Sequence, residues 1–160
     1  MLTKSNITGN RNTSWIPDFG ASFHVFAKPQ NIKQHSHFDG LDEIFIGNSE
    51  GLSIFYVGFS SFVSPHDSHI TFKLHNLLHV PSITKNVLSV SQFATNNFLF
   101  YQFHLDVCCI KSQGTNKVLL QGFVGADGLY SFHNLNFQDN SFVLLSSSKS
   151  FSGSATHSSL

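Results

Sequence analysis

The chain has 160 residues, a formal net charge of zero and only 11% charged residues, against roughly 25% in a typical soluble domain. This composition predicts no basic surface of the kind that binds nucleic acid, and the sequence has no acidic tail. No apolar run approaches the ~20 residues that span a membrane, and the polar N-terminus lacks the apolar stretch of a secretory signal. We expect one intracellular, cytoplasmic domain that is not secreted and has no nucleic-acid or membrane partner.

Phenylalanine is the unusual component, with 18 residues, whereas there is a single methionine. Phe, Val and Ile favour strands, and we predict an all-β fold. The polar residues 1–13 are predicted to be a disordered N-terminus, and the Ser-rich residues 138–160 a flexible tail. The folded domain is then expected over residues 14–137.

The first strand signals form a hairpin. Residues 43–46 and 52–59 are two apolar runs on either side of a polar turn with a Gly at each end, residues 47–51. This arrangement predicts a β-hairpin. Apolar and polar residues then alternate over 70–75, which predicts a strand with one buried face.

Further turns punctuate the second half of the chain. Residues 98–110 form a long apolar run, and shorter strands are predicted at 117–121 and 129–132, each after a Gly-containing turn. Turns about every 8 to 15 residues are typical of a β-sandwich or a β-barrel.

One short helix is predicted within residues 86–97. Val87, Val90 and Ala94 recur at helical spacing, which gives the segment one apolar face. Either Asn86 or Thr84 would cap the start of this helix, and Asn96 or Asn97 would end it.

Histidines and cysteines offer no strong site. The ten histidines include three close pairs: His35 and His37, His66 and His69, and His75 and His79. None of these pairs has the second pair of ligands that a zinc site needs. Cys108 and Cys109 are adjacent in an apolar run, where neighbouring strand residues face opposite ways and a buried thiol is unreactive. We expect no metal and no cofactor.

The segment WIPDFGASFH, residues 15–24, can carry chemistry. An aspartic protease uses two carboxylates that share one proton. Each carboxylate lies on a tight loop in which Asp is followed by a small hydroxyl residue and then by Gly. Gly is needed because a Cβ at its position would clash with the packed backbone of the loop. Asp18, Gly20 and Ala21 are the candidate catalytic-loop residues, and a chain with one such Asp needs a second copy.

This segment resembles the opening motif of the retropepsin-like domain in copia-type retrotransposon Pol polyproteins. The residues that match the motif are Trp15, Asp18, Gly20, Ala21, Ser22 and His24. The hairpin turn resembles the flap of that family, which assigns the flap to Gly47, Asn48, Ser49, Glu50 and Gly51. Residues 74–93 are similar to its long strand-and-helix signature, and VLLQG and DGLYSF to its closing strands.

The resemblance covers residues 15–132 and implies a small closed or partly open β-barrel with one short helix. It also implies descent from an aspartic endopeptidase that processes its own polyprotein within virus-like particles, in elements that are abundant in plants. A homodimer through the Asp18 loop and a polypeptide substrate would follow if the domain were active.

Two residues depart from the family motif. Phe19 stands where the family has Ser or Thr, so a hydrogen bond between the two loops is lost and a large ring is added. Losing a buried hydrogen bond costs roughly 0.5–1.5 kcal/mol, and overpacking adds about 1–3 kcal/mol. Pro17 stands where an aliphatic residue is usual, and it removes a backbone donor from the strand.

The sequence leaves three hypotheses open. We favour a retroelement-derived barrel in which Phe19 impairs catalysis. The alternatives are an active homodimeric aspartic endopeptidase that tolerates Phe19, and a non-enzymatic binding or scaffold barrel whose sheet edges accept a peptide strand.

Overall fold

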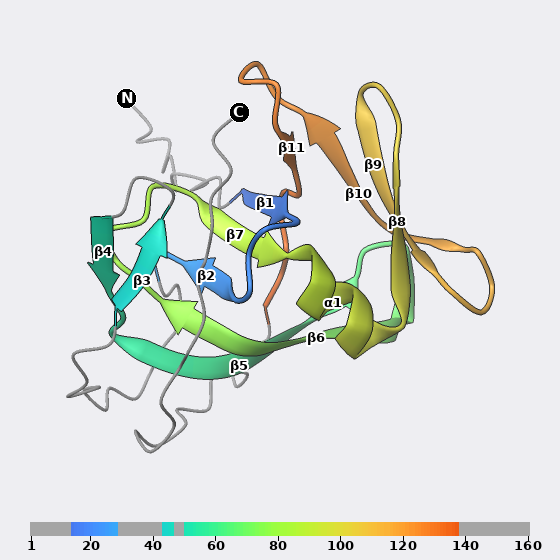
Figure 1. The fold of residues 1–160 in the computed structure, drawn as a ribbon. Helices are drawn as coiled ribbons and strands as arrows, with labels where there is room; N and C mark the ends of the chain where they lie inside the picture. Colours follow the sequence, from blue (N-terminus) through green and yellow to red (C-terminus); the bar gives the residue numbers. More distant parts are fainter. Residues whose placement is uncertain (1–13, 29–42, 47–49, 138–160) are drawn as a thin grey trace, which may run out of the picture.

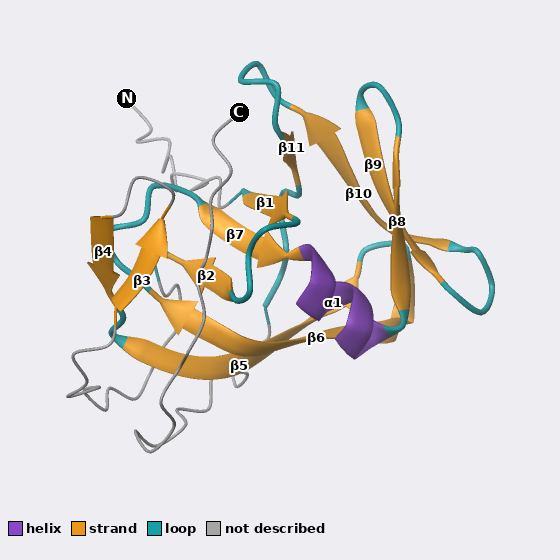
Figure 2. Cartoon of the chain, in the orientation of Figure 1, coloured by secondary structure: helices purple, strands orange, loops and turns teal. Residues whose placement is uncertain are grey.

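The computed structural model describes residues 14–28, 43–46 and 50–137 (Figure 1). The fold is mostly β, as predicted, with one short helix (Figure 2). A five-stranded sheet has the order β1 (Trp15–Asp18), β7 (Asn86–Ser89), β2 (His24–Phe26), β6 (Asp67–His79) and β5 (Tyr56–Ser64). A four-stranded sheet has the order β11 (Tyr130–Ser131), β10 (Val118–Val124), β9 (Val107–Ser112) and β8 (Leu99–Phe103).

A backbone bridge joins β1 of the first sheet to the end of β11 in the second. Trp15 of β1 and Phe132, next to β11, exchange backbone hydrogen bonds of 2.9 and 2.8 Å. The strands therefore follow one another from β8 to β5, and these two strands form the ends of the series. No strand ladder joins β8 to β5 in the described part of the chain. The barrel is therefore partly open. Helix α1 (Val90–Asn97) packs against β6 and β8 and lies across the opening.

The long β5–β6 hairpin contains a bulge, and the buried apolar residues form two separate cores. Gly58 pairs with Leu77 but Ser60 pairs with Leu74, so β6 has one residue more than β5 at this point. Asn76 takes φ 54° there, a left-handed conformation that Asn tolerates better than most residues. The larger core includes Phe62, Phe72 and Phe93, and the smaller one includes Val25, Val57 and Leu78.

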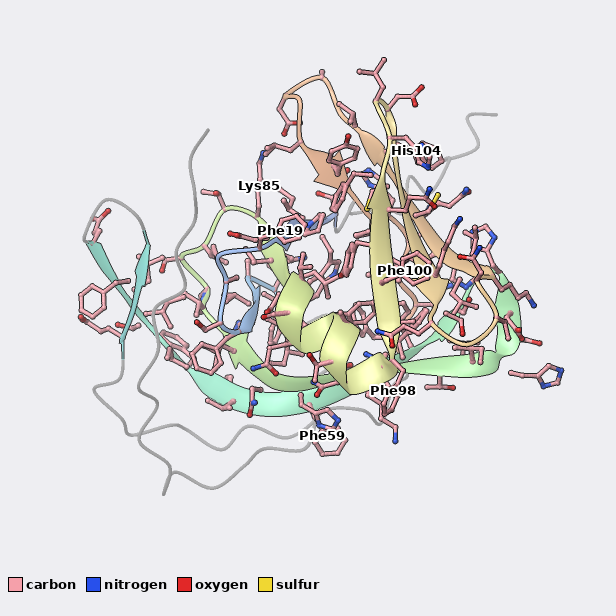
Figure 3. The ribbon with its side chains drawn as sticks, turned by 45° about the vertical axis from the view of Figure 1, so that its right-hand side comes forward. Phe19, Phe59, Lys85, Phe98, Phe100 and His104 are labelled. Atoms are coloured by element: carbon pink, nitrogen blue, oxygen red, sulfur yellow. The ribbon has the colours of Figure 1, made fainter. Side chains whose placement is uncertain are left out.

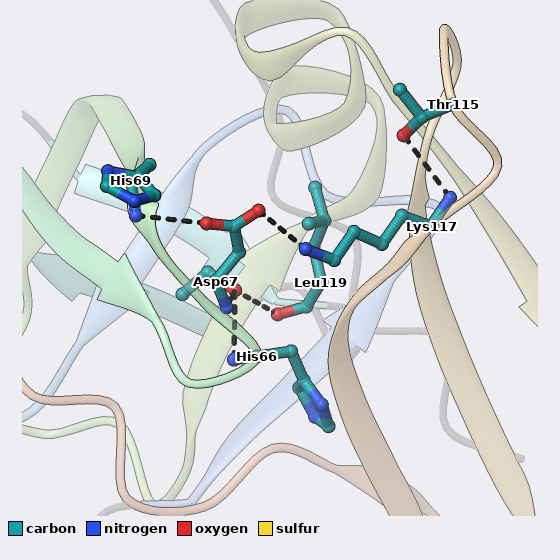
Figure 4. Close-up of polar contacts among 7 residues, drawn as sticks. His66, Asp67, His69, Thr115, Lys117 and Leu119 are labelled. Carbon is teal, nitrogen blue, oxygen red and sulfur yellow. Dashed lines mark hydrogen bonds and ion pairs between the residues drawn. The ribbon is translucent and has the colours of Figure 1, made fainter.

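The tip of the same hairpin is tied to the second sheet (Figure 4). The Ser64 hydroxyl donates to the carbonyl oxygen of Leu119 at 2.6 Å, and Lys117 forms an ion pair of 2.8 Å with Asp67. The Lys117 ammonium lowers the pKa of the Asp67 carboxyl. The buried hydroxyl bond holds the hairpin tip against β10.

The helix begins later than the sequence predicts. Residues 86–89 form β7, which pairs in parallel with β1 and also contacts β2, so sheet pairing overrides the helical spacing of Val87. Ser89 caps α1 by accepting a bond from the Gln92 N–H, whereas Asn86 and Thr84 were expected in that role. At the other end the C-cap is Phe98, and Asn97 is the last helical residue.

The predicted strands are present, with two corrections. The run 52–59 is divided between β4 (Glu50–Ser53) and β5, and the run 98–110 is a β8–β9 hairpin that turns at 104–106. The 43–46 strand is β3 (Glu43–Ile46), and it pairs with β4 as the predicted hairpin. The predicted termini, residues 1–13 and 138–160, lie outside the described residues.

Gly122 marks a close approach within the second sheet. A Cβ at this position would lie 2.8 Å from the backbone oxygen of Ser131 and 2.9 Å from the Phe132 ring. Gly122→Ala is therefore expected to lower the free energy of unfolding by about 1–3 kcal/mol, measured by urea denaturation. Gly114→Ala is the control, because its Cβ would meet nothing closer than 3.9 Å. Equal stability of the two variants would contradict the prediction.

Candidate functional site

Asp18 is the last residue of β1, where the strand passes into the loop 19–23. The side chain is buried, with 7% of the residue exposed. Its Oδ1 accepts a hydrogen bond of 2.7 Å from the N–H of Gly20, two residues further on. Such a local bond is typical of Asp in tight turns. The carboxyl group therefore helps to shape the loop that carries it.

The Asp18 loop is attached to the junction of β7 and α1. The Ser89 hydroxyl donates to the carbonyl oxygen of Ala21 at 2.7 Å. The Ser89 N–H donates to Nδ1 of His24 at 3.0 Å, and the Gln92 side chain donates to the carbonyl oxygen of Ser22 at 3.1 Å. The loop is thus held within a single chain by bonds that do not involve residue 19.

His24 is a fully buried member of this network. Its Nδ1 accepts the Ser89 bond, so the proton of the neutral ring is on Nε2. Burial, together with the charge of nearby His75, lowers the pKa of His24 from 6.5 to about 3. The ring therefore serves as a neutral hydrogen-bond acceptor beneath the loop.

Phe19 points out of the loop, with 69% of the residue exposed. Its ring lies 5.4 Å from that of Phe103 on β8, between ring centroids. Phe19 thus contacts the second sheet while most of its surface faces solvent. The Phe19 ring is therefore not overpacked within one chain, and it would clash only with a second copy that approached the loop.

The structure corrects the interpretation of Pro17. Trp15 directs both its N–H and its C=O to Phe132, away from β7. Successive strand residues direct their backbone groups to opposite sides, so the Pro17 nitrogen faces the same way as that of Trp15. The missing N–H therefore removes no bond to β7, and it faces the side on which Trp15 is joined to Phe132. Of the two residues that depart from the family motif, only Phe19 changes the exposed surface of the loop.

The hairpin predicted as a flap contacts the same core as the loop. Ile44 of β3 and Ala21 of the loop belong to the smaller core. Glu50 pairs with Ile46, and Gly51 with Phe45. The other predicted flap residues, Gly47, Asn48 and Ser49, lie outside the described residues.

The remaining histidines and cysteines form no metal cluster in the part of the chain that the structure describes. His79 is buried between the rings of Phe26 and Tyr56, and burial lowers its pKa. Cys108 and Cys109 are both free and buried, and burial raises the pKa of Cys108 to about 12. His35 and His37 lie outside the described residues.

Sequence reasoning missed the role of Ser89 and Gln92. The segment Ser89-Val90-Ser91-Gln92 matches the Ser-x-x-Gln pattern of a helix capping box, so the pattern could have located the start of the helix. The bonds from this junction to Ala21 and Ser22 span 68 and 70 residues. No local pattern predicts contacts over that separation.

Ser89→Ala is expected to loosen the Asp18 loop, because it removes the hydroxyl that holds Ala21. Amide hydrogen exchange at Gly20 and Ala21 should become at least about tenfold faster, a loss of ~1.4 kcal/mol of local protection. Ser64→Ala is the matched control, since it also removes a buried hydroxyl bonded to a carbonyl oxygen. The prediction is wrong if both variants accelerate loop exchange equally.

The chain matches the family model described as "Pol polyprotein, beta-barrel domain" over residues 15–98, more than half of its length. The chain belongs to the Pol polyprotein β-barrel family. The matched region of this Pol β-barrel domain runs from β1 to the C-cap of α1, so it contains both the Asp18 loop and Ser89. The resemblance expected from the sequence is confirmed at this level.

Two curated relatives of the Pol β-barrel domain come from Arabidopsis thaliana. The retrovirus-related Pol polyprotein from transposon RE1 is 30% identical over 148 residues, which is 92% of this chain and 10% of the relative. The corresponding polyprotein from transposon RE2 is 30% identical over 146 residues, 91% of this chain and 9% of the relative. The chain thus spans about a tenth of these relatives. No solved structure matches it, and no helix among the described residues is long and apolar enough to cross a membrane.

Proposed function

We propose that the chain is the protease-derived β-barrel domain of a copia-type retrotransposon Pol polyprotein, and that Phe19 impairs its aspartic peptidase chemistry. The similarity to the two plant transposon polyproteins supports the origin. The observation that carries the chemical part is the Asp18 loop, in which a buried carboxyl group is followed by an exposed phenylalanine.

The chemistry requires two copies of this loop. In an aspartic peptidase one carboxylate activates water and the other, protonated, polarises the scissile carbonyl group. Each chain would contribute one Asp18, placed by the bond from Gly20 and by the anchoring of the loop to Ser89. The substrate would be an extended polypeptide bound between the loops and the flap hairpins.

Phe19 obstructs this arrangement at its centre. The family has a small hydroxyl residue beside the Asp, and here a ring stands there with most of its surface exposed. A second loop approaching Asp18 would meet the ring, and the two carboxyl groups would be held apart. Because a misplacement of 1 Å can cost about 10²-fold in rate, we expect the dimeric site to be strongly impaired.

A peptide-cleavage assay tests this proposal. The full chain and Asp18→Asn are incubated with a peptide library under mildly acidic conditions, and cleavage products are measured by mass spectrometry. We expect the two proteins to give the same background. Turnover by the unmodified chain that Asp18→Asn abolishes would contradict the proposal and would establish the alternative of an active endopeptidase.

A further inference from the structure

The segment that follows β11 contacts both outer strands of the five-stranded sheet. Phe132 exchanges two backbone hydrogen bonds with Trp15 of β1, and Phe137 forms a backbone bridge with Phe62 of β5. β1 and β5 are the first and last strands in the order of this sheet. In Figure 1 the orange-red segment after β11 passes β1 and runs toward β5. We call residues 132–137 the strap, because they connect the two edges of the sheet.

Apolar side chains anchor the strap in the larger core. Phe132 is fully buried and Leu135 is 7% exposed. Phe137 packs against the same core, and its ring lies 5.4 Å from that of Trp15 and 5.3 Å from that of Phe62, between centroids. The other strap residues are exposed: His133, Asn134 and Asn136. The strap is therefore held at both ends and in its middle by burial of apolar surface.

Few backbone hydrogen bonds support the strap and β1. Residues 133–136 belong to no helix or strand, and Asn134 takes φ 57°, which interrupts an extended course. β1 has four residues, and Pro17 has no N–H to donate. By contrast, β5 and β6 pair over most of their length. Segments with few backbone bonds open locally at a lower free energy than long strand ladders do, so the strap and β1 are the part of the barrel expected to open first.

The strap is connected to Asp18 through β1. Trp15 is the first residue of this strand and Asp18 is the last. Trp15 is buried, and it contacts the strap through both its backbone and its ring. Beyond Asp18, the Phe19 ring lies 5.4 Å from that of Phe103 on β8, and Figure 3 shows Phe19 and the His104 end of β8 in the same region of the molecule. β1 is thus held at its start by the strap and at its end by the Asp18 loop.

We propose that the strap positions Asp18, and that the strap and β1 open together as one local unit while the rest of the barrel stays folded. The inference rests on the proposed function, since it concerns the carboxyl group of that site. With the strap closed, Phe132 and Phe137 hold Trp15, and β1 places Asp18. With the strap open, only β7 still pairs with β1, and the carboxyl group can move. A shift of 1 Å is enough to cost about 10²-fold in a catalytic rate.

Native-state amide hydrogen exchange of the full chain, followed by nuclear magnetic resonance, tests this inference. Under conditions in which the opening equilibrium sets the rate, the protection of an amide measures the free energy of the opening that exposes it. We expect the amides of Trp15, Phe132 and Asp18 to have a common protection factor. It should be at least about tenfold below that of Ile110, which lies on β9 between β8 and β10.

Phe137→Ala removes the anchor at the far end of the strap. It should make exchange of the same three amides at least about tenfold faster relative to Ile110. Tyr101→Ala is the matched control, because Tyr101 is also a partly buried aromatic residue that packs against the larger core, but it lies on β8. Asn136→Ala changes an exposed residue of the strap, and it should alter these rates by less than about twofold.

Three outcomes would overturn the inference. They are equal protection of the three amides and Ile110 in the unmodified chain, faster exchange of Phe132 without faster exchange of Asp18 in Phe137→Ala, and equal acceleration in Tyr101→Ala. The first outcome is measured on the unmodified chain, so the test does not depend on the folding of a variant. Hydrogen exchange requires no catalysis. Cleavage by the unmodified chain would therefore contradict only the proposed function, and a strap that does not open with β1 would contradict only this inference.

Discussion

Phe19→Ser is expected to give the chain Asp18-dependent peptidase activity, at least about 10²-fold above the unmodified protein. In the proposed dimer, the replacement would remove the ring that separates the two loops and would supply a hydroxyl that can bond across them. It leaves the loop itself intact, because Ala21, Ser22 and Gly20 are held by bonds that do not involve residue 19. Cleavage of a peptide library measures the gain, at high protein concentration because the proposed active unit is a dimer.

Two controls define the result of this experiment. Asp18→Asn in the Phe19→Ser background should abolish the gained activity. Adding Pro17→Leu should give no further gain, because the Pro17 nitrogen faces away from β7. A folded Phe19→Ser protein with no activity would show that the defect lies elsewhere, in the flap hairpin or in the dimer contacts.

Acid is expected to destabilise the fold through its buried histidines. Burial lowers the pKa of His24 to about 3 and also lowers that of His79, whereas both are near 6.5 in the unfolded chain. As pH falls below about 6.5, the unfolded chain binds protons that the folded chain cannot accept. The free energy of unfolding therefore falls with pH, by up to about 1.4 kcal/mol per pH unit for His24 until about pH 3.

Urea denaturation between about pH 7 and about pH 4 measures this effect. His24→Asn should reduce the pH dependence, because Asn cannot be protonated and its side-chain oxygen can still accept the Ser89 N–H. His66→Gln, a change at an exposed histidine, should leave the dependence unchanged. An unaltered pH slope in His24→Asn would contradict the prediction. Peptidase assays at acidic pH should therefore be run at pH values at which the fold is still stable.

Local patterns predicted the architecture well where the physical cause is local. The richness in Phe and the frequent turns predicted an all-β fold, and the polar turn between two apolar runs predicted the β3–β4 hairpin. The motif around Asp18 predicted a tight loop, and the structure has the Asp18–Gly20 bond of such a loop. The later motifs in the right order predicted the family.

Predictions failed where distant segments decide the outcome. The helical spacing over 86–97 is real, but β7 takes residues 86–89 because β1 and β2 lie on either side of it. The run 98–110 has strand propensity throughout, yet it turns at 104–106 to pair with itself as β8 and β9. Propensity alone cannot place such boundaries, because pairing partners set them.

The sequence by itself determined the β class, the barrel family and the presence of one carboxyl group on a loop in which a phenylalanine follows the Asp. Composition, turn chemistry and an ordered set of motifs are properties of neighbouring residues, so they can be recognised along the chain. The tertiary structure alone decided that Ser89 holds the loop, that the Pro17 nitrogen faces away from β7 and that the Phe19 ring lies against Phe103. These depend on which strands lie side by side, and bonds that join residues about 70 positions apart are set by the fold as a whole.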